Sequence, residues 1–338
     1  MRKTFLLALL GLAACAPRLV GVDPSRPPDP TDWSPRPAPL EWWYVAAYLP
    51  EERLAIQWAA FKAYTPPELP LAFVAPGPYF AMHLAVTDLE ADRFLFNERT
   101  DFPWGYAEVQ ARPLSIALDG WRFAEEDGRF ILRAGALELV LTPEKPPVVH
   151  PPGYSGTAQT GRMYYTSYTR VRLEGRWGAR PLAGVAWMDH QWGVQRSGTA
   201  ATWDWFGLHL SDGSEVMLYR VKDAAGRVVQ LAGSRVDANG RVQALEGLEM
   251  RPLTRWASPS GRVYVVGWRV LARGLDLVLR PERLEQEILS RTTRVAYWEG
   301  PVVGEGAWNG TRVRAWGMGE FVAGSYDPSA MPLFGDAP

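Results

Sequence analysis

The residues best suited to chemistry form two short clusters that mix acids with aromatic rings. In the first cluster, Asp189, His190, Gln191 and Trp192 are consecutive. Side chains alternate between the faces of a β-strand, so Asp189 and Gln191 share one face while His190 and Trp192 share the other. In one interpretation, Asp189 or His190 exchanges a proton with an apolar substrate stacked on Trp192. In the alternative, Asp189 accepts backbone N–H bonds and holds a junction between domains in shape.

The second cluster is Trp203-Asp204-Trp205. Alternation places Asp204 on the same face as the apolar residue Phe206 and both tryptophans on the other face. An unpaired buried carboxylate is unfavourable, so the pKa of such an acid rises and the acid stays protonated near neutral pH. A desolvated acid can donate a proton in catalysis, and electron-rich rings nearby stabilise a cation. The sequence therefore predicts Asp204 or Asp189 as a catalytic acid.

A hairpin supplies partners for Asp204. Tyr219 and Arg220 follow the turn dipeptide Asp212-Gly213 on the return strand. A count symmetrical about the dipeptide places Tyr219 close to opposite Phe206 and next along the ladder to Asp204. We expect Tyr219 and His190 to assist the acid or to position water. In the alternative, a tyrosine or arginine merely satisfies a buried Asp204.

Other aromatic and imidazole side chains on apparent strands are candidates for the wall of a ligand pocket. Each could equally belong to a hydrophobic core, because aromatic residues on strands commonly pack inside. His150 lies among prolines and is expected at the surface. The expected ligand contacts are Trp42, Tyr44, His83, Tyr165, Trp192, Trp203, Trp205 and Trp298.

Several classes of protein find no support in the sequence. It contains no GxSxG nucleophile elbow, no GxxxxGK[ST] phosphate loop, no GxGxxG after a strand and no HExxH zinc motif. With one cysteine and four histidines, we expect no metal site and no cofactor. The 36 basic and 37 acidic residues nearly balance, which argues against a nucleic-acid partner.

Turn signals and apolar runs predict an all-β chain. The 32 glycines and 29 prolines break the sequence into short segments, and 16 tryptophans favour aromatic-lined surfaces or cavities. Only the stretch near 281–291 is expected to be helical. Small and polar residues between 193 and 201 predict a boundary near residue 195. We therefore expect two antiparallel β-barrel domains packed side by side, at 41–195 and 196–328.

The N-terminus predicts export. Arg2 and Lys3 precede an apolar run that ends at Leu12 and is too short to span a bilayer. The segment Leu12-Ala13-Ala14-Cys15 resembles a bacterial lipobox, which implies removal of residues 1–14 and a lipid on Cys15; a plain signal peptide is the alternative. Residues 15–40 are rich in proline and would form a tether. The expected location is a membrane-anchored lipoprotein that faces the periplasm or the cell exterior.

A set of motifs, taken in order, resembles the AttH and carotenoid 1,2-hydratase family. No single cluster is specific, but together they extend from about residue 41 to residue 325. One position departs from the pattern, because relatives commonly carry Glu where Gln191 stands. The motifs are Glu41-Trp42-Trp43-Tyr44, Phe80 to Asp88, Tyr164-Tyr165-Thr166-Ser167, Gly184 to Gly193, Trp203-Asp204-Trp205-Phe206, Trp256-Ala257-Ser258-Pro259 and Tyr297-Trp298-Glu299-Gly300.

The resemblance implies two lipocalin-like barrels with a ligand site near their interface. It also implies three hypotheses for function, because the family includes hydratases of isoprenoid double bonds and resembles pericyclic cyclases. The first is an envelope lipoprotein that binds an apolar, isoprenoid- or polyketide-like molecule and hydrates it by acid catalysis. The second is a non-catalytic carrier or envelope-assembly protein, with a lipoprotein-export-type permease system as a possible partner. The third is a pericyclase that accelerates ring closure by shape.

Overall fold

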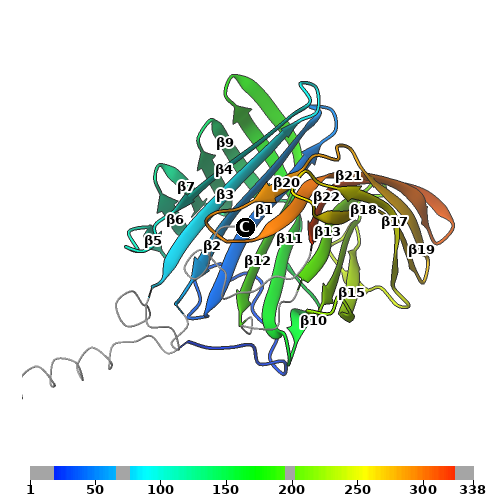
Figure 1. Cartoon of the computed structure of the whole chain (residues 1–338), viewed down its shortest axis with the longest axis horizontal. Coiled ribbons are helices and arrows are strands. Elements are labelled where there is room, and N and C mark those ends of the chain that lie inside the picture. Colours follow the sequence, from blue (N-terminus) through cyan, green and yellow to red (C-terminus); the bar gives the residue numbers. More distant parts are fainter. Residues whose placement is uncertain (1–18, 66–76, 195–201, 324–338) are drawn as a thin grey trace, which may run out of the picture.

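The computed structural model describes residues 19–65, 77–194 and 202–323. Within these ranges every regular element is a β-strand, and the strands form two antiparallel sheets that lie side by side (Figure 1). The expectation of an all-β, two-domain lipocalin-like fold is confirmed. The expected signal segment and Cys15 lie outside the described residues, as does most of the 193–201 stretch. No helix in the described ranges is long and apolar enough to cross a bilayer.

The first sheet has twelve strands in the order β4-β3-β2-β1-β12-β11-β9-β8-β7-β6-β5, with β10 paired to β11. Consecutive strands are neighbours except β4 and β5, which lie at opposite ends of the order, and β9 and β10, which both pair with β11. In addition, β12 returns to pair with β1. This return brings the start of the domain next to its end. The strands are β1 (Leu40–Leu49), β2 (Leu54–Ala63), β3 (Tyr79–Asp88), β4 (Arg93–Thr100), β5 (Glu108–Gln110), β6 (Ser115–Leu118), β7 (Trp121–Glu126), β8 (Arg129–Ala134), β9 (Leu137–Pro143), β10 (Val148–Thr157), β11 (Gly161–Trp177) and β12 (Arg180–Gly193).

The second sheet has ten strands in the order β16-β15-β14-β13-β22-β21-β19-β18-β17, with β20 paired to β21. Its last strand, β22, pairs with its first, β13, as β12 pairs with β1. In both sheets, therefore, the last strand pairs with the first. The strands are β13 (Thr202–Leu210), β14 (Glu215–Lys222), β15 (Val228–Val236), β16 (Val242–Ala244), β17 (Glu249–Ala257), β18 (Val263–Ala272), β19 (Leu275–Pro281), β20 (Glu287–Leu289), β21 (Ala296–Trp308) and β22 (Thr311–Val322).

The stretch near 281–291 is not helical, contrary to the expectation. β19 ends at Pro281, and Glu287–Leu289 forms β20 against β21. Gln286, Ile288 and Ser290 are all buried, which is the period of two that belongs to a strand. The helix-forming residues here carry only a weak intrinsic preference, and pairing with β21 overrides it.

The central strands are buried on both faces. On β1, Trp43 and Val45 pack in the core of the first sheet, whereas Tyr44 and Ala46 face the second sheet. The sequence of a strand that is covered on both faces is continuously apolar and does not alternate between apolar and polar residues. This explains why the segment from residue 40 to 49 lacks the alternation of an ordinary half-exposed strand.

The hairpin between β13 and β14 differs by one residue from the expected register. Tyr219 lies opposite Trp205, not Phe206. The cause is the turn, because the Asp212 carboxylate accepts a bond from the Ser214 backbone N–H at 3.0 Å and Gly213 takes a φ of 80°. A three-residue turn with a left-handed glycine centres the hairpin on Asp212 instead of between Asp212 and Gly213.

Charged side chains tie the two sheets together. Glu215 on β14 is fully buried and accepts bonds from Lys145 Nζ at 2.7 Å and Arg170 Nε at 2.6 Å. Both cations come from the first sheet or its β9–β10 connection. A buried carboxylate with two cations is satisfied, whereas one left alone would be strongly destabilising. This ion triad fixes how the sheets meet.

The described part of the proline-rich tether packs against the first sheet. Trp33 is 2% exposed and belongs to the first core. Its carbonyl oxygen accepts a bond from Trp43 Nε1 at 2.9 Å, and the Arg36 backbone N–H donates to Glu41. Proline blocks regular strand pairing here, and the segment is held on the domain by the buried Trp33 and by these hydrogen bonds.

Candidate functional site

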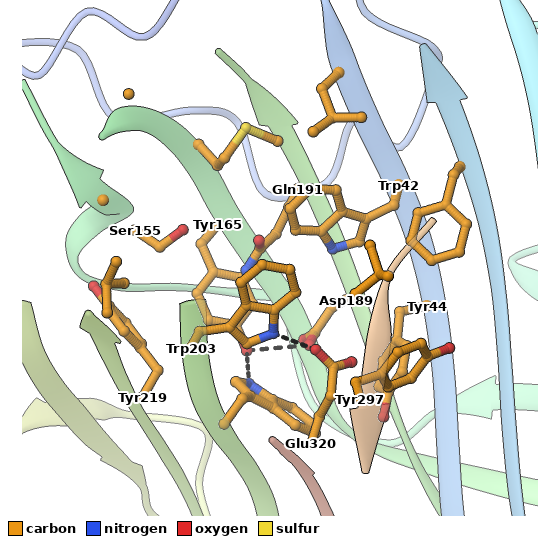
Figure 2. A pocket seen from close by; sticks show the side chains of 18 of the residues that line it. Trp42, Tyr44, Ser155, Tyr165, Asp189, Gln191, Trp203, Tyr219, Tyr297 and Glu320 are labelled. Carbon is orange, nitrogen blue, oxygen red and sulfur yellow. Dashed lines mark hydrogen bonds between the residues drawn. The ribbon is translucent and has the colours of Figure 1, made fainter. Parts of the chain in front are cut away.

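A cavity of about 120 Å³ lies at the junction of the two sheets. One water molecule needs only ~10–15 Å³ on this measure, so a substrate group and a water fit together. Most of its wall is aromatic or aliphatic, and Figure 2 shows the rings of Trp42, Tyr44 and Trp203 close to two carboxyl groups. These two are Asp189 on β12 and Glu320 on β22. Each sheet therefore contributes one acid to the same apolar space.

Asp189 is 4% exposed and held by three donors. Its Oδ1 accepts bonds from Ser167 Oγ at 2.5 Å and Trp187 Nε1 at 2.6 Å, and its Oδ2 accepts one from Tyr165 Oη at 3.1 Å. Burial raises the pKa of Asp189 to about 7 although the three donors act in the opposite direction. A carboxyl group with a pKa near neutrality can both give and take a proton.

Tyr165 links Asp189 to the second sheet. Its hydroxyl accepts a bond from Trp205 Nε1 at 2.7 Å and donates to Asp189, as a dashed line in Figure 2 shows. The Tyr44 ring meets Trp205 edge to face, with 5.4 Å between ring centroids. An indole N–H can only donate, so Trp205 fixes the direction of the Tyr165 hydroxyl.

The second acid belongs to a carboxyl pair. Glu320 and Glu299 are directly opposite across β22 and β21, so their side chains are neighbours on one face of the sheet. Trp203 Nε1 donates to Glu320, and Tyr44 Oη donates to Glu299 at 2.7 Å. Burial raises the pKa of both, and the charge of Glu320 raises that of Glu299 further. Burial and mutual repulsion therefore both favour a state in which one of the two neighbouring carboxyls carries a proton.

Most of the sequence-predicted pocket residues come together in this wall. They share positions on the faces of the central strands that look toward the other sheet. Gln191, two residues after Asp189, lines the cavity with it, as alternation along a strand predicts. The predicted residues in the wall are Trp42, Tyr44, Tyr165, Asp189, Trp203, Trp205 and Tyr219.

Asp204 does not reach the junction cavity, and this corrects its predicted role as the acid. It lies on the core-facing side of β13, as alternation predicts, but its carboxylate is paired. Arg220 Nε lies 2.5 Å from Asp204 Oδ2, and Lys222 Nζ lies 3.0 Å from the same atom. Arg220 and Lys222 thus satisfy the buried Asp204, as the structural alternative for this residue requires.

His190, Trp192 and Trp298 also lie outside the cavity wall. His190 is fully buried on the other face of β12, where Nε2 is 2.8 Å from Glu41 Oε1. The Trp192 ring packs on it with 4.5 Å between centroids. Trp298 is fully buried in the second core. The same alternation that sends Asp189 into the junction sends His190 and Trp192 away from it.

Two histidines stand behind the cavity wall. His83 Nδ1 is 3.0 Å from the hydroxyl of Tyr297, which lines the cavity, and burial lowers the pKa of His83 to about 4. His150 is 1% exposed, so its expected surface position is wrong. Its Nε2 is 2.9 Å from Ser167 Oγ. The prolines around His150 do not expose it, because β10 packs against the second sheet through Ser234.

The sequence analysis missed Glu320 and Glu299 as site residues. Glu320 sits between Gly319 and Phe321, and Glu299 between Trp298 and Gly300, in locally apolar stretches of β22 and β21. The rule that drew attention to Asp204, an acid alone among apolar strand residues, applies to both. Among the residues that the structure describes, no group of three or more His, Cys, Asp or Glu side chains could hold a metal ion.

Two curled antiparallel sheets with a cavity where they meet define a lipocalin-like two-domain protein. The chain belongs to the AttH-like family, whose sequence model matches residues 22–324. A Nitrosomonas europaea protein assigned as AttH is 25% identical, with a TM-score of 0.76 over 90% of this chain and 99% of that one. Kievitone hydratase from Nectria haematococca is 16% identical, with a TM-score of 0.68 over 92% of this chain and 97% of that one. No curated protein sequence matches the chain.

Proposed function

We propose that this protein binds an apolar, unsaturated molecule in the junction cavity and adds water to a carbon–carbon double bond by acid–base catalysis. One observation carries the proposal: two desolvated carboxyl groups, Asp189 and Glu320, enter an otherwise aromatic and aliphatic space from opposite sheets. Such a space favours apolar ligands. A structural neighbour is a hydratase, but at 16% identity that likeness extends to the fold alone, so the chemical argument rests on the cavity.

The reaction needs a proton donor, a stabilised cation and a proton acceptor. Glu320 gives the proton that it shares with Glu299 to the less substituted carbon of the double bond. The faces of Trp203, Trp205 and Tyr44 stabilise the carbocation. Water adds to the cation, and the surplus proton of that water passes to Asp189. The alkene gains one water molecule in total, and the proton returns from Asp189 to the Glu pair or to solvent before the next turnover.

The pocket assigns different roles to the two acids. The Glu pair keeps a proton because two carboxylates cannot both be charged in a dry site. Asp189 has a pKa of about 7, near ambient pH, which suits a group that must accept a proton and release it. The reverse reaction, loss of water from a tertiary alcohol, uses the same groups in exchanged roles.

The experiment begins with native mass spectrometry of the protein purified from its own envelope, to find a co-purifying apolar molecule. That molecule is then incubated with the protein in water labelled with heavy oxygen. Asp189→Asn and Glu320→Gln are compared with the control Glu287→Gln. Glu287 also accepts a tyrosine hydroxyl, from Tyr264 at 2.8 Å, but lies outside the cavity.

We expect the wild type and the control to incorporate labelled oxygen, and the two cavity variants to lose at least a hundredfold in rate while the ligand still binds. Binding without any incorporation, in the wild type as well, would instead establish a carrier. Turnover that survives both substitutions and incorporates no labelled oxygen would establish a pericyclase, since shape then supplies the acceleration.

We also propose that the chain works in the cell envelope, anchored through a lipid on Cys15. The sole cysteine follows an apolar run and a Leu-Ala-Ala segment, where lipidation requires it. A lipoprotein-export-type permease would then be a partner in sorting. The location suits a reactant that partitions into a membrane.

A further inference from the structure

We propose that His150 is a positioning residue that switches tautomer as Asp189 gains or loses its proton. The proposal deepens the proposed function, since it concerns the acid that we assign to the junction cavity. It rests on a row of hydrogen bonds that passes from the cavity wall into the second sheet. We call the row Asp189–Ser167–His150–Ser234 the relay.

The relay is continuous and dry. Ser167 Oγ lies 2.5 Å from Asp189 Oδ1, His150 Nε2 lies 2.9 Å from Ser167 Oγ, and His150 Nδ1 lies 2.7 Å from Ser234 Oγ. Ser167 and Ser234 are fully buried, and His150 is 1% exposed. Three elements of the first sheet and one strand of the second, β15, meet in this row. Its groups must satisfy one another.

The direction of each bond follows from the charge of Asp189. With Asp189 ionised, Ser167 donates to Oδ1, so its oxygen accepts from His150 Nε2–H. His150 Nδ1 is then bare and accepts from the hydroxyl of Ser234. Every hydrogen in the relay points toward the carboxylate, and every buried donor has an acceptor.

A proton on Asp189 reverses the relay. Trp187 Nε1 always donates to Oδ1, and Tyr165 donates to Oδ2 because its oxygen accepts from Trp205 Nε1. Ser167 is the partner that can change from donor to acceptor. Oδ1–H then donates to Ser167, Ser167 donates to a bare His150 Nε2, and Nδ1–H donates to Ser234. The relay holds one proton more in total, and the imidazole has exchanged Nε2–H for Nδ1–H without becoming charged.

His150 remains neutral in both states. Burial lowers its pKa to about 3, and its ring is stacked on Trp187 at 5.9 Å and packs on Tyr165 at 4.8 Å. The titratable groups that face Asp189 from other elements are Tyr165 on β11, Tyr44 on β1 and Glu320 on β22. None of these groups is a cation. Because His150 also stays neutral, any proton that the relay takes up is bound by Asp189.

The relay has a consequence for catalysis. A buried donor without an acceptor is unfavourable. A fixed hydrogen-bond donor in place of His150 would therefore penalise one protonation state of Asp189. An imidazole that offers either N–H or a bare nitrogen to Ser167 satisfies the Ser167 hydroxyl in both states. Asp189 can therefore accept a proton and release it within one catalytic cycle.

The first experiment is nuclear magnetic resonance of isotope-labelled histidine in the full chain, from about pH 5 to about pH 9. The chain has four histidines, so the imidazole signals are few. We expect His150 to change from mainly Nε2–H at high pH to mainly Nδ1–H at low pH, with no imidazolium signal. The change should be absent in Asp189→Asn. In a competing arrangement Ser167 turns to Tyr165 Oη and the tautomer stays fixed; a fixed tautomer in the wild type would overturn the inference.

The second experiment measures the titration of Asp189 by its labelled carboxyl carbon. In His150→Leu the Ser167 hydrogen has lost its alternative acceptor, so we expect the pKa of Asp189 to fall by about one unit, a tenfold loss in proton affinity. His150→Gln keeps a donor and an acceptor and should restore the wild-type value. His209→Leu is the control, because His209 also packs on Trp187, at 6.4 Å, but lies outside the relay.

An equal shift in His150→Leu and His209→Leu would overturn the inference, since it would reflect packing alone. If a variant fails to fold, the tautomer of His150 in the wild type still tests the inference. Neither experiment uses a substrate. A protein that binds ligand without turnover would therefore refute the proposed function and leave the relay in place, whereas a fixed tautomer would refute the relay alone.

Discussion

Replacement of Asp189 by asparagine should change the pH dependence of stability. The pKa of Asp189 is raised from 3.8 to about 7 in the folded protein. Between these values the folded state holds a proton that the unfolded state releases, so wild-type stability falls as pH rises and levels off above the folded pKa. The gap of about three units corresponds to about 4 kcal/mol. Asparagine does not titrate, so Asp189→Asn lacks this decline.

The measurement is the free energy of unfolding in urea, for wild type and Asp189→Asn, at steps from about pH 4 to about pH 8. From the low to the high end of this range, the unfolding free energy of the variant should rise by about 4 kcal/mol relative to that of the wild type. A constant difference between the two proteins, introduced by the amide, does not affect this change. Asp276→Asn is the control, because Asp276 is solvated beside Arg269 and its pKa is lowered. A difference between Asp189→Asn and wild type that stays constant with pH would refute the claim that Asp189 titrates near neutrality.

Three further predictions test the scaffold and the anchor. Asp204→Asn should destabilise the protein by about 3 kcal/mol in urea unfolding, because it leaves Arg220 without its charged partner. The ligand should still co-purify with this variant. Loss of the ligand from a folded variant would contradict the assignment of Asp204 outside the site. Gly317→Ala should lower the unfolding free energy by about 3 kcal/mol or prevent folding, since its Cβ would lie 2.0 Å from the Gly207 carbonyl oxygen; a wild-type melting curve would contradict this. Cys15→Ser should abolish incorporation of labelled fatty acid and move the protein out of the membrane fraction; retained label would refute the anchor.

Much of the architecture could be predicted because the relevant signals are local. Turn dipeptides such as Asp212-Gly213 specify hairpins through a left-handed glycine, and alternation specifies which face a residue takes. Alternation correctly separated Asp189 and Gln191 from His190 and Trp192. The one-residue error in the β13–β14 register arose because turn length depends on the Asp212 cap, which the dipeptide alone does not reveal.

The composition of the site could be predicted only in part, because it depends on which faces of distant strands meet. Asp204 and Glu320 are both acids in apolar strand sequences. Glu320 faces the other sheet, whereas Asp204 faces inward, where Arg220 and Lys222 neutralise it. Nothing in the neighbouring sequence separates the two cases, since the difference lies in long-range pairing. His150 was misplaced for the same reason, because its partner Ser234 belongs to the other sheet.

The position of the acids also explains why the site lies at the junction. Each sheet encloses its own apolar core, and a carboxyl directed there must be paired, as Asp204 is. The outward faces of β12 and β22 would be solvated in an isolated domain, so burial would not raise the pKa of Asp189 or Glu320 there. Docking removes water from both at once and raises both pKa values through burial. The proposed chemistry is therefore a property of the docked pair of sheets, which the Glu215 ion triad helps to hold together outside the cavity.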